Sequence, residues 1–181
     1  MDSNFAYIDG ANLYNSIKAS GWELDYERFR VWLRDKYRVE RACIFLGLIP
    51  KCNDLYTHLQ QAGFTLIFKE VIYDNTGKAK GNCDADLVLQ ATRDAYENKL
   101  NKAVIVSSDG DYACLVKFLL KKEKMGTLLS PAITEKCSIL LKRTGVKIAY
   151  LEEQRSILEC IQKEKTPSQD KLSKGSFRKN K

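Results

Sequence analysis

The chain has 181 residues, of which 44% are hydrophobic and 10% aromatic, enough for one hydrophobic core. Its net charge is +7, and no stretch approaches the roughly 18 uninterrupted apolar residues that a membrane-spanning helix needs. The opening residues 1–4 also lack the basic and apolar regions of a secretory signal. Composition therefore disfavours an integral membrane or secreted protein, and we expect a cytoplasmic one.

From the N-terminus onward, short apolar and β-branched runs alternate with longer segments of helical period. This alternation is typical of β-α units around a parallel sheet. In chain order, the predicted strands are Phe5–Ile8, Ala42–Leu48, Thr65–Phe68, Ala103–Val106, Thr127–Leu129 and Lys147–Tyr150. The predicted helices are Leu13–Ala19, Tyr26–Tyr37, Asp54–Ala62, Ala85–Asn98, Tyr112–Lys122 and Glu135–Arg143. Most strands are apolar along their whole length, so we expect central strands covered on both faces.

Turn-forming residues separate several of these elements. Gly63, Gly126 and Gly145 closely follow three of the predicted helices, where glycine commonly ends a helix. The stretch Asp74–Gly77 has the composition of a turn.

The end of the chain differs in composition from the rest. From about Lys163 onward polar residues dominate and periodicity disappears, so we predict one domain over 1–162 and a basic, disordered tail over 163–181. Of the net charge of +7, residues 166–181 carry +4, with Asp170 as their only acid. A basic tail is typical of a polyanionic partner such as RNA, although a solvated terminus explains the composition equally well.

Cysteine and histidine offer little for catalysis. The six cysteines are widely spaced, form no Cys-x-x-Cys pair and lie mostly in apolar segments, which indicates reduced, partly buried thiols. The only histidine, His58, falls on a polar helix and is expected at the surface. A structural zinc site or a histidine-based centre is therefore disfavoured, and carboxylates must carry any chemistry.

Acidic residues follow the apolar strands at one predicted edge of the sheet. Asp9 directly follows the first strand, Asp109 and Asp111 follow the strand Ala103–Val106, and Asp84 stands at the start of a helix. In an open α/β sheet the ligand site lies beyond the carboxyl ends of the strands. Crowded carboxylates repel unless a cation neutralises them, and Mg²⁺ or Mn²⁺ prefers oxygen ligands. The pattern predicts a metal site that activates water for attack on a phosphodiester.

Each acid also has a simpler explanation. Asp84, Asp109 and Asp111 suit helix N-termini, where aspartate caps or complements the dipole. Asp9 precedes no predicted helix start and so caps nothing obvious. Asp86 lies two residues beyond Asp84, where its side chain diverges, and we interpret it as peripheral. Three independent strand-end acids together favour a metal site over three separate caps.

Three segments resemble the motifs of NYN domains, a PIN-like nuclease group that includes the LabA-like proteins. They are Tyr7–Leu13, Lys80–Leu89 and Val106–Tyr112, the last being similar to the family's Ser-Gly-Asp-Gly-Asp-Phe. The likeness extends over roughly residues 4–152. It implies a PIN-like three-layer α/β/α sandwich with a mainly parallel central sheet, and a divalent-metal site that cuts single-stranded or structured RNA.

Position by position, the resemblance implies that Asp9, Asp84 and Asp109 form the metal-binding catalytic core, with Asp111 as a further acid. Two polar residues, Asn12 and Ser107, would orient ligands or water.

Two positions depart from the family pattern: Ser108 replaces a usual glycine, and Gln90 stands where many members carry another aspartate. The second departure leaves open whether the site holds one metal ion or two. Lys78 and Lys80 precede the helix headed by Asp84 and either contact substrate phosphates or remain solvated.

These features predict a metal-dependent endoribonuclease that uses Mg²⁺ or Mn²⁺ and metal-activated water. The alternative is a non-catalytic RNA-binding module with a PIN-like fold. A phosphatase is disfavoured because no aspartate stands two residues after Asp9. The chain could also form a homodimer or bind a regulatory protein partner, and the sequence favours neither.

Overall fold

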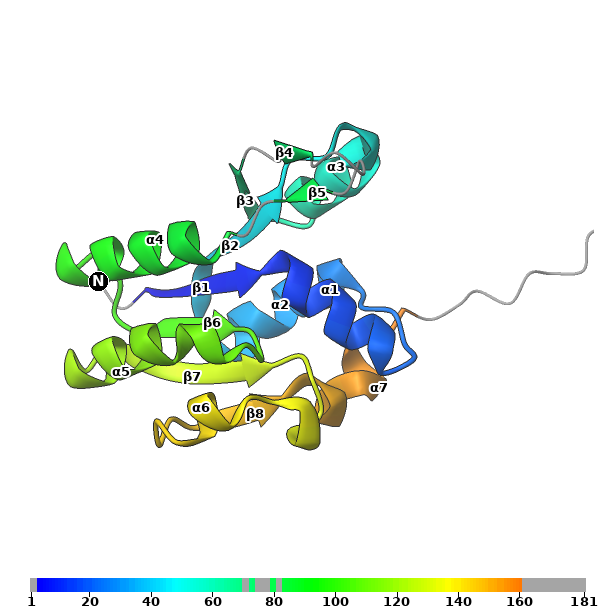
Figure 1. The fold of residues 1–181 in the computed structure, drawn as a ribbon. Helices are drawn as coiled ribbons and strands as arrows, with labels where there is room; N and C mark the ends of the chain where they lie inside the picture. Colours follow the sequence, from blue (N-terminus) through cyan, green and yellow to red (C-terminus); the bar gives the residue numbers. More distant parts are fainter. Residues whose placement is uncertain (1–2, 70–71, 74–78, 81–82, 161–181) are drawn as a thin grey trace, which may run out of the picture.

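The structure is a computed structural model that describes residues 3–69, 72–73, 79–80 and 83–160. Within these residues a six-stranded, entirely parallel sheet has the order β3-β2-β1-β6-β7-β8 (Figure 1). Its strands are β1 (Asn4–Asp9), β2 (Val39–Gly47), β3 (Thr65–Lys69), β6 (Ala103–Val106), β7 (Met125–Ser130) and β8 (Ile148–Tyr150).

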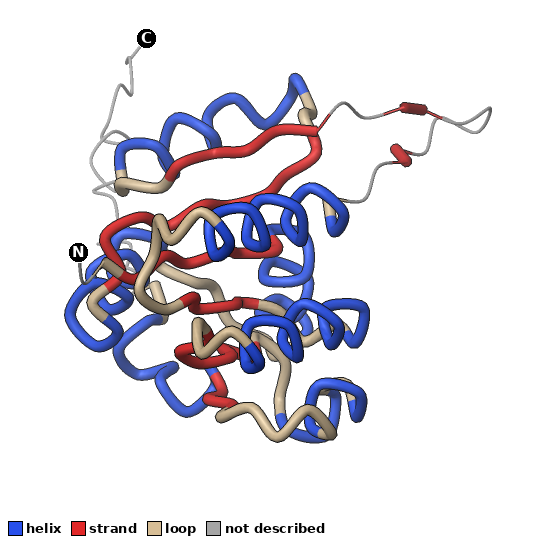
Figure 2. Tube along the Cα trace, turned by 90° about the vertical axis from the view of Figure 1, so that its left-hand side faces the viewer, coloured by secondary structure: helices blue, strands red, loops and turns tan. Residues whose placement is uncertain are grey.

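Helices cover both faces of this sheet (Figure 2). One face carries α1 (Gly10–Ala19), α2 (Tyr26–Tyr37), α3 (Asn53–Gln61) and α7 (Arg155–Leu158). The other carries α4 (Asp84–Tyr96), α5 (Ala113–Lys121) and α6 (Ile139–Lys142). Of the helices in the described part of the chain, none has the length and apolar character that crossing a bilayer requires.

Alternate residues of each strand supply two separate cores. In β1, Ala6 and Ile8 pack with α1 and α2, whereas Tyr7 between them packs with α4 and α5. Successive side chains of a strand point to opposite faces, so an uninterrupted apolar strand must be covered twice. The predicted α/β class and the three-layer α/β/α sandwich with a mainly parallel sheet are confirmed.

The predicted strands are all present, and the helices differ from prediction mainly at their ends. Helix α1 begins at Gly10 rather than Leu13. The single helix predicted over Glu135–Arg143 is wrong, because a 3₁₀ turn at Thr134–Lys136 is followed by a separate α6 that Ser138 caps. In the described part of the chain, the elements that were not predicted are all short: the antiparallel pair β4 (Ile72–Tyr73) and β5 (Ala79–Lys80), helix α7 and three other 3₁₀ turns.

Two of the three predicted glycine stops are correct. Gly63 and Gly145 follow α3 and α6 with φ of +91° and +76°, which glycine adopts without strain. Gly126 instead lies inside β7, and Glu123 takes the left-handed conformation after α5, with φ of +55°. The predicted turn at 74–77 and tail at 163–181 lie outside the described residues.

All six cysteines are free, in agreement with the prediction of reduced thiols. Cys43 and Cys137 are buried in the core beneath α4, α5 and α6, and Cys114 is exposed. Burial raises the pKa of the Cys43 thiol, which keeps it protonated and unreactive at neutral pH.

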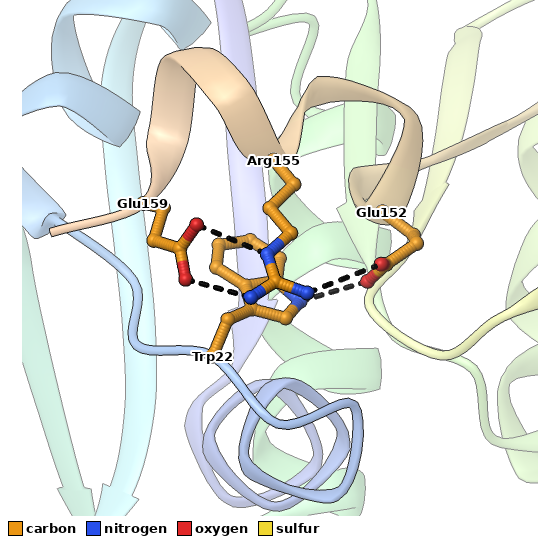
Figure 3. Close-up of polar contacts among 4 residues, drawn as sticks. All are labelled: Trp22, Glu152, Arg155 and Glu159. Atoms are coloured by element: carbon orange, nitrogen blue, oxygen red, sulfur yellow. Dashed lines mark hydrogen bonds and ion pairs between the residues drawn. The ribbon is translucent and has the colours of Figure 1, made fainter.

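The last described element is fastened to the loop between α1 and α2 (Figure 3). The indole nitrogen of Trp22 donates to Glu152 Oε2 at 2.8 Å. Arg155 makes a two-pronged ion pair with Glu159 at 2.9 and 3.0 Å, and the hydrogen bond lowers the pKa of the Glu159 carboxyl. Leu24 forms a β-bridge to Glu159, and the Asp25 N–H donates to the Leu158 carbonyl oxygen at 2.8 Å. These two contacts and the Trp22–Glu152 hydrogen bond hold α7 against the loop between α1 and α2.

Candidate active site

The order in which strands are added to the sheet reverses between its two central strands, β1 and β6. From β1 the chain continues into β2 and β3 on one side, and β6, β7 and β8 follow on the other. Ligand sites of open α/β sheets lie at such a switch point, beyond the carboxyl ends of the strands. Asp9 is the last residue of β1, and Ser107–Asp109 follow β6. The two motifs therefore reach the same edge of the sheet from adjacent strands.

Asp9 makes two kinds of contact. Its Oδ1 accepts from the Asn12 backbone N–H at 3.0 Å and caps α1. The expectation that Asp9 caps nothing is therefore wrong, because α1 starts at Gly10, immediately after the strand. Its Oδ2 lies 3.2 Å from the Tyr112 hydroxyl. Burial, with smaller contributions from the negative charges of Asp84 and Asp109, raises the pKa of Asp9 against the opposing effect of its hydrogen bonds.

Asp84 meets Asp9 through the same hydroxyl. It is the first residue of α4, and its Oδ1 lies 2.5 Å from the Tyr112 hydroxyl oxygen. Cys83, not Asp84, occupies the N-cap position. Capping is therefore not the role of Asp84, although its charge complements the start of the helix. Asp9 and Asp84, 75 residues apart in sequence, converge on one oxygen atom.

Tyr112 is the residue that sequence reasoning missed. It ends the 3₁₀ turn Gly110–Tyr112, and its ring is fully buried beside α4 and α5. Burial, then the hydrogen bond to Asp84 and the charge of Asp9, raises the pKa of Tyr112 well above its usual range, so the phenol stays protonated. The sequence offered one signal for this role. Position 112 is a tyrosine, whereas the third family motif ends in phenylalanine, so the hydroxyl distinguishes this chain from the motif.

Asn12 and Ser107 hold the backbone of the site. Asn12 Oδ1 accepts from both the backbone N–H and the hydroxyl of Ser108, each at 2.9 Å. Ser107 is buried, and its hydroxyl oxygen accepts from the Asp109 N–H at 3.1 Å. These bonds join the start of α1 to the loop after β6. The serine at position 108 thus gains a hydrogen bond that a glycine side chain does not offer.

Asp109 and Asp111 differ in their surroundings. Asp109 Oδ1 accepts from the Asp111 N–H at 3.0 Å and caps the 3₁₀ turn, as the simpler explanation expected. Its charge also reaches Asp9, where it helps to raise the pKa. Asp111 is exposed and caps nothing.

Glycine follows Asp9 and Asp109 because the chain is crowded there. A Cβ at Gly10 would lie 2.3 Å from Leu46 Cδ2 and 2.9 Å from the Phe45 carbonyl oxygen. A Cβ at Gly110 would lie 2.4 Å from the Ser138 hydroxyl oxygen. The two Asp-Gly pairs let each acid sit at a tightly packed turn.

Asp86 and His58 lie outside this group. Asp86 forms an ion pair with Lys69 at 3.1 Å, in agreement with a peripheral position. His58 is exposed on α3, with its ring edge-on to a tyrosine. Lys80 lies in β5, ahead of α4, and Lys78 lies outside the described residues.

A fully buried acid, Asp94, lies near the other end of α4. It is 1% exposed and accepts from the Tyr7 hydroxyl at 3.0 Å and from Gln90 Nε2 at 2.8 Å. Gln90 therefore binds Asp94 rather than extending the acidic group at Asp9. Sequence reasoning did not select Asp94, because one acid on an amphipathic helix carries no distinguishing pattern.

The donor set suits a hard divalent cation. Asp9 and Asp84 offer oxygen atoms at a partly buried site with excess negative charge, the environment that Mg²⁺ and Mn²⁺ neutralise. Within the described ranges, no three histidine, cysteine, aspartate or glutamate side chains are gathered closely enough to enclose an ion. The residues thus fit an ion held by few protein ligands, which is usual for Mg²⁺ with its retained waters.

A separate cavity lies between α1, α2 and α3. It measures about 680 Å³, has Tyr14, Trp22 and Tyr26 in its wall, and carries acidic residues Glu23 and Glu27. Negative side chains repel phosphates, so this cavity does not suit RNA.

A parallel sheet with strand-end acids at its switch point is the architecture of PIN-like nucleases. Within that class, the chain belongs to the NYN domain family, whose model matches residues 6–144. No curated protein matches the sequence. The fold is similar to the crystal structure of a protein of unknown function from Vibrio parahaemolyticus RIMD 2210633, with a TM-score of 0.70 at 22% identity over 87% of this chain and 96% of that one.

Proposed function

We propose that this NYN domain is a metal-dependent endoribonuclease that hydrolyses RNA phosphodiester bonds with Mg²⁺ or Mn²⁺. The observation that carries the proposal is the convergence of Asp9 and Asp84 on one hydroxyl at the switch point of the sheet. Membership of a PIN-like nuclease family supports RNA as the substrate. Burial, and to a smaller extent the charges of Asp84 and Asp109, disfavours the charged form of Asp9, so a cation beside these acids would offset an unfavourable arrangement.

Each acid has a proposed role in the site. Asp9 and Asp84 would hold the ion, Asp109 would add negative charge beside them, and the exposed Asp111 would contribute at the rim. When bound, the ion lowers the pKa of a water molecule and offsets charge on the phosphate. We assign Asn12 and Ser107 the task of keeping the acids in place through the backbone of the site.

Substrate contacts are proposed from position in the sequence. Lys78 and Lys80 precede α4, whose first residue is Asp84, so their ammonium groups would contact phosphates of RNA entering the site. Such contacts position the RNA backbone and carry no sequence preference.

The test is cleavage of end-labelled RNAs of mixed sequence by the purified chain with Mn²⁺ or Mg²⁺. The same reactions are run with EDTA and with Asp9→Asn. We expect cleavage by the native chain alone, and only with the metal present. RNA binding without cleavage, equal in the native and Asp9→Asn proteins, would favour the non-catalytic RNA-binding module instead.

A further inference from the structure

The Tyr112 hydroxyl is shared by two acids from different parts of the chain. Its oxygen lies 2.5 Å from Asp84 Oδ1 and 3.2 Å from Asp9 Oδ2. A phenol carries one proton, so it donates mainly to the nearer carboxylate while remaining within reach of the other. The second oxygen of Asp9 is already held by the Asn12 N–H. The hydroxyl thus determines how the β1 acid and the α4 acid face each other.

The ring and the hydroxyl of Tyr112 serve different purposes. The ring fills the core with Leu87 and Leu115, and a phenylalanine ring would fill the same space. Among the described residues, the hydroxyl lies within hydrogen-bond distance of the two site acids. The family motif that this segment resembles has phenylalanine here, so this chain carries a hydroxyl that the motif lacks. A buried hydroxyl needs hydrogen-bond partners, and the two site acids supply them.

We propose that Tyr112 is a positioning residue that orients the Asp9 and Asp84 carboxylates for a divalent cation, an inference that rests on the proposed function. Hydrogen-bond donors behind ligating carboxylates fix their orientation, and losing one typically weakens metal binding by about 10–100-fold. Tyr112 performs this task for two acids together. It does not touch the reacting atoms and is not a catalytic residue.

The protein contains a matched control for this hydroxyl. Tyr7 is also fully buried, and its hydroxyl donates at 3.0 Å to Asp94, an acid on the same helix as Asp84. Tyr7→Phe therefore removes a buried tyrosine–aspartate hydrogen bond away from the site, while Tyr112→Phe removes one within it. A loss common to both variants reflects folding, and a loss confined to Tyr112→Phe reflects the site.

The experiment measures Mn²⁺ affinity of the full chain without RNA, by electron paramagnetic resonance of free Mn²⁺. We expect the Kd to rise about 10-fold or more in Tyr112→Phe and to stay within about twofold of native in Tyr7→Phe. In RNA cleavage, Tyr112→Phe should need correspondingly more Mn²⁺ for half-maximal rate, with KM for RNA unchanged. Thermal unfolding in EDTA checks that both variants fold.

Each outcome decides between the two proposals. Native Mn²⁺ affinity in Tyr112→Phe, or an equal loss in Tyr7→Phe, would overturn the positioning role while leaving the ribonuclease intact. A native chain that neither binds Mn²⁺ nor cleaves RNA would overturn the proposed function, and this inference with it.

Discussion

Asp9 combines a structural and a chemical role in a single carboxylate. One oxygen caps α1 and the other faces Tyr112 and Asp84. The cap is worth about 1 kcal/mol in typical helices, whereas burial beside two other acids raises the pKa and disfavours the charged form. A helix start at the end of a strand can therefore hold an acid in a position that would otherwise be unfavourable.

Substitution of the site acids tests their roles separately. With Mn²⁺ present, Asp9→Asn, Asp84→Asn and Asp109→Asn should each lower the cleavage rate at least about 100-fold, because a neutral amide no longer neutralises a cation. Asp111→Asn should lose less, since its side chain is exposed at the rim. The measurement is the single-turnover rate on an end-labelled RNA.

The matched control is Asp86→Asn, on the same helix as Asp84 but paired with Lys69 at 3.1 Å. It should cleave RNA at close to the native rate, as should His58→Ala on α3. Native activity in Asp84→Asn, or an equal loss in Asp86→Asn, would contradict the assignment.

Metal-free stability should show the cost of the Asp9 charge. Because folding raises the pKa above its ordinary value of 3.8, the folded protein binds the Asp9 proton more tightly. The stabilisation that comes from this tighter proton binding is complete below pH 3.8 and is lost as the pH rises through the pKa of Asp9 in the folded protein. In EDTA at neutral pH, Asp9→Asn should melt about 2–4 °C above native, equivalent to about 1 kcal/mol. The difference should shrink as pH falls below the folded pKa, and a lower Tm for the variant at neutral pH would contradict it.

The reaction products should identify the nucleophile. Ribonucleases that rely on histidine use the RNA 2′-hydroxyl, but His58, the only histidine, is exposed on α3 and contacts none of the site acids. Attack by water needs no 2′-hydroxyl and leaves a 5′-phosphate and a 3′-hydroxyl. End-group analysis by phosphatase and kinase treatment checks this, and 2′,3′-cyclic phosphate ends would contradict it.

At the scale of elements, strands and long helices were predictable and their junctions were not. Apolar runs such as Ala103–Val106 identify strands because a doubly covered strand must be apolar throughout. The break between Thr134–Lys136 and α6 depends on a cap by Ser138 that periodicity does not reveal. Likewise, Gly126 follows a helix closely yet belongs to β7, because Glu123 supplies the left-handed turn.

The junction between β1 and α1 should tolerate no side chain at Gly10. In Gly10→Ala, the new Cβ would meet Leu46 Cδ2 at 2.3 Å and the Phe45 carbonyl oxygen at 2.9 Å, and the carbonyl belongs to β2, the strand paired with β1. We expect a loss of about 1–3 kcal/mol in the free energy of unfolding. Urea denaturation measures it, with Ala11→Ser at the neighbouring exposed position as the control. Equal stability of the two variants would show that the strand shifts freely.

Across the whole molecule, the approach of Asp9 to Asp84 was predictable, but the contacts that join them were not. Three motifs in order indicated Asp9, Asp84 and Asp109, because carboxyl ends of parallel strands share one edge. The link through Tyr112 depends on a side-chain distance set by the packing of α4 and α5. Sequence pattern locates a site on the sheet, and packing decides which atoms meet there.

The basic tail should contribute to RNA binding without contributing to the fold. Residues 166–181 carry +4 of the net charge, and the last described element, α7, is already fastened by the Trp22–Glu152 hydrogen bond that precedes it and by the Leu24–Glu159 bridge that follows it. Deleting 166–181 should therefore leave Tm unchanged, weaken RNA affinity and reduce the slope of log Kd against log salt concentration, because fewer counterions are released. Filter binding from low to high salt measures the slope. A lower Tm would make the segment structural, and an unchanged slope would exclude it as an RNA contact.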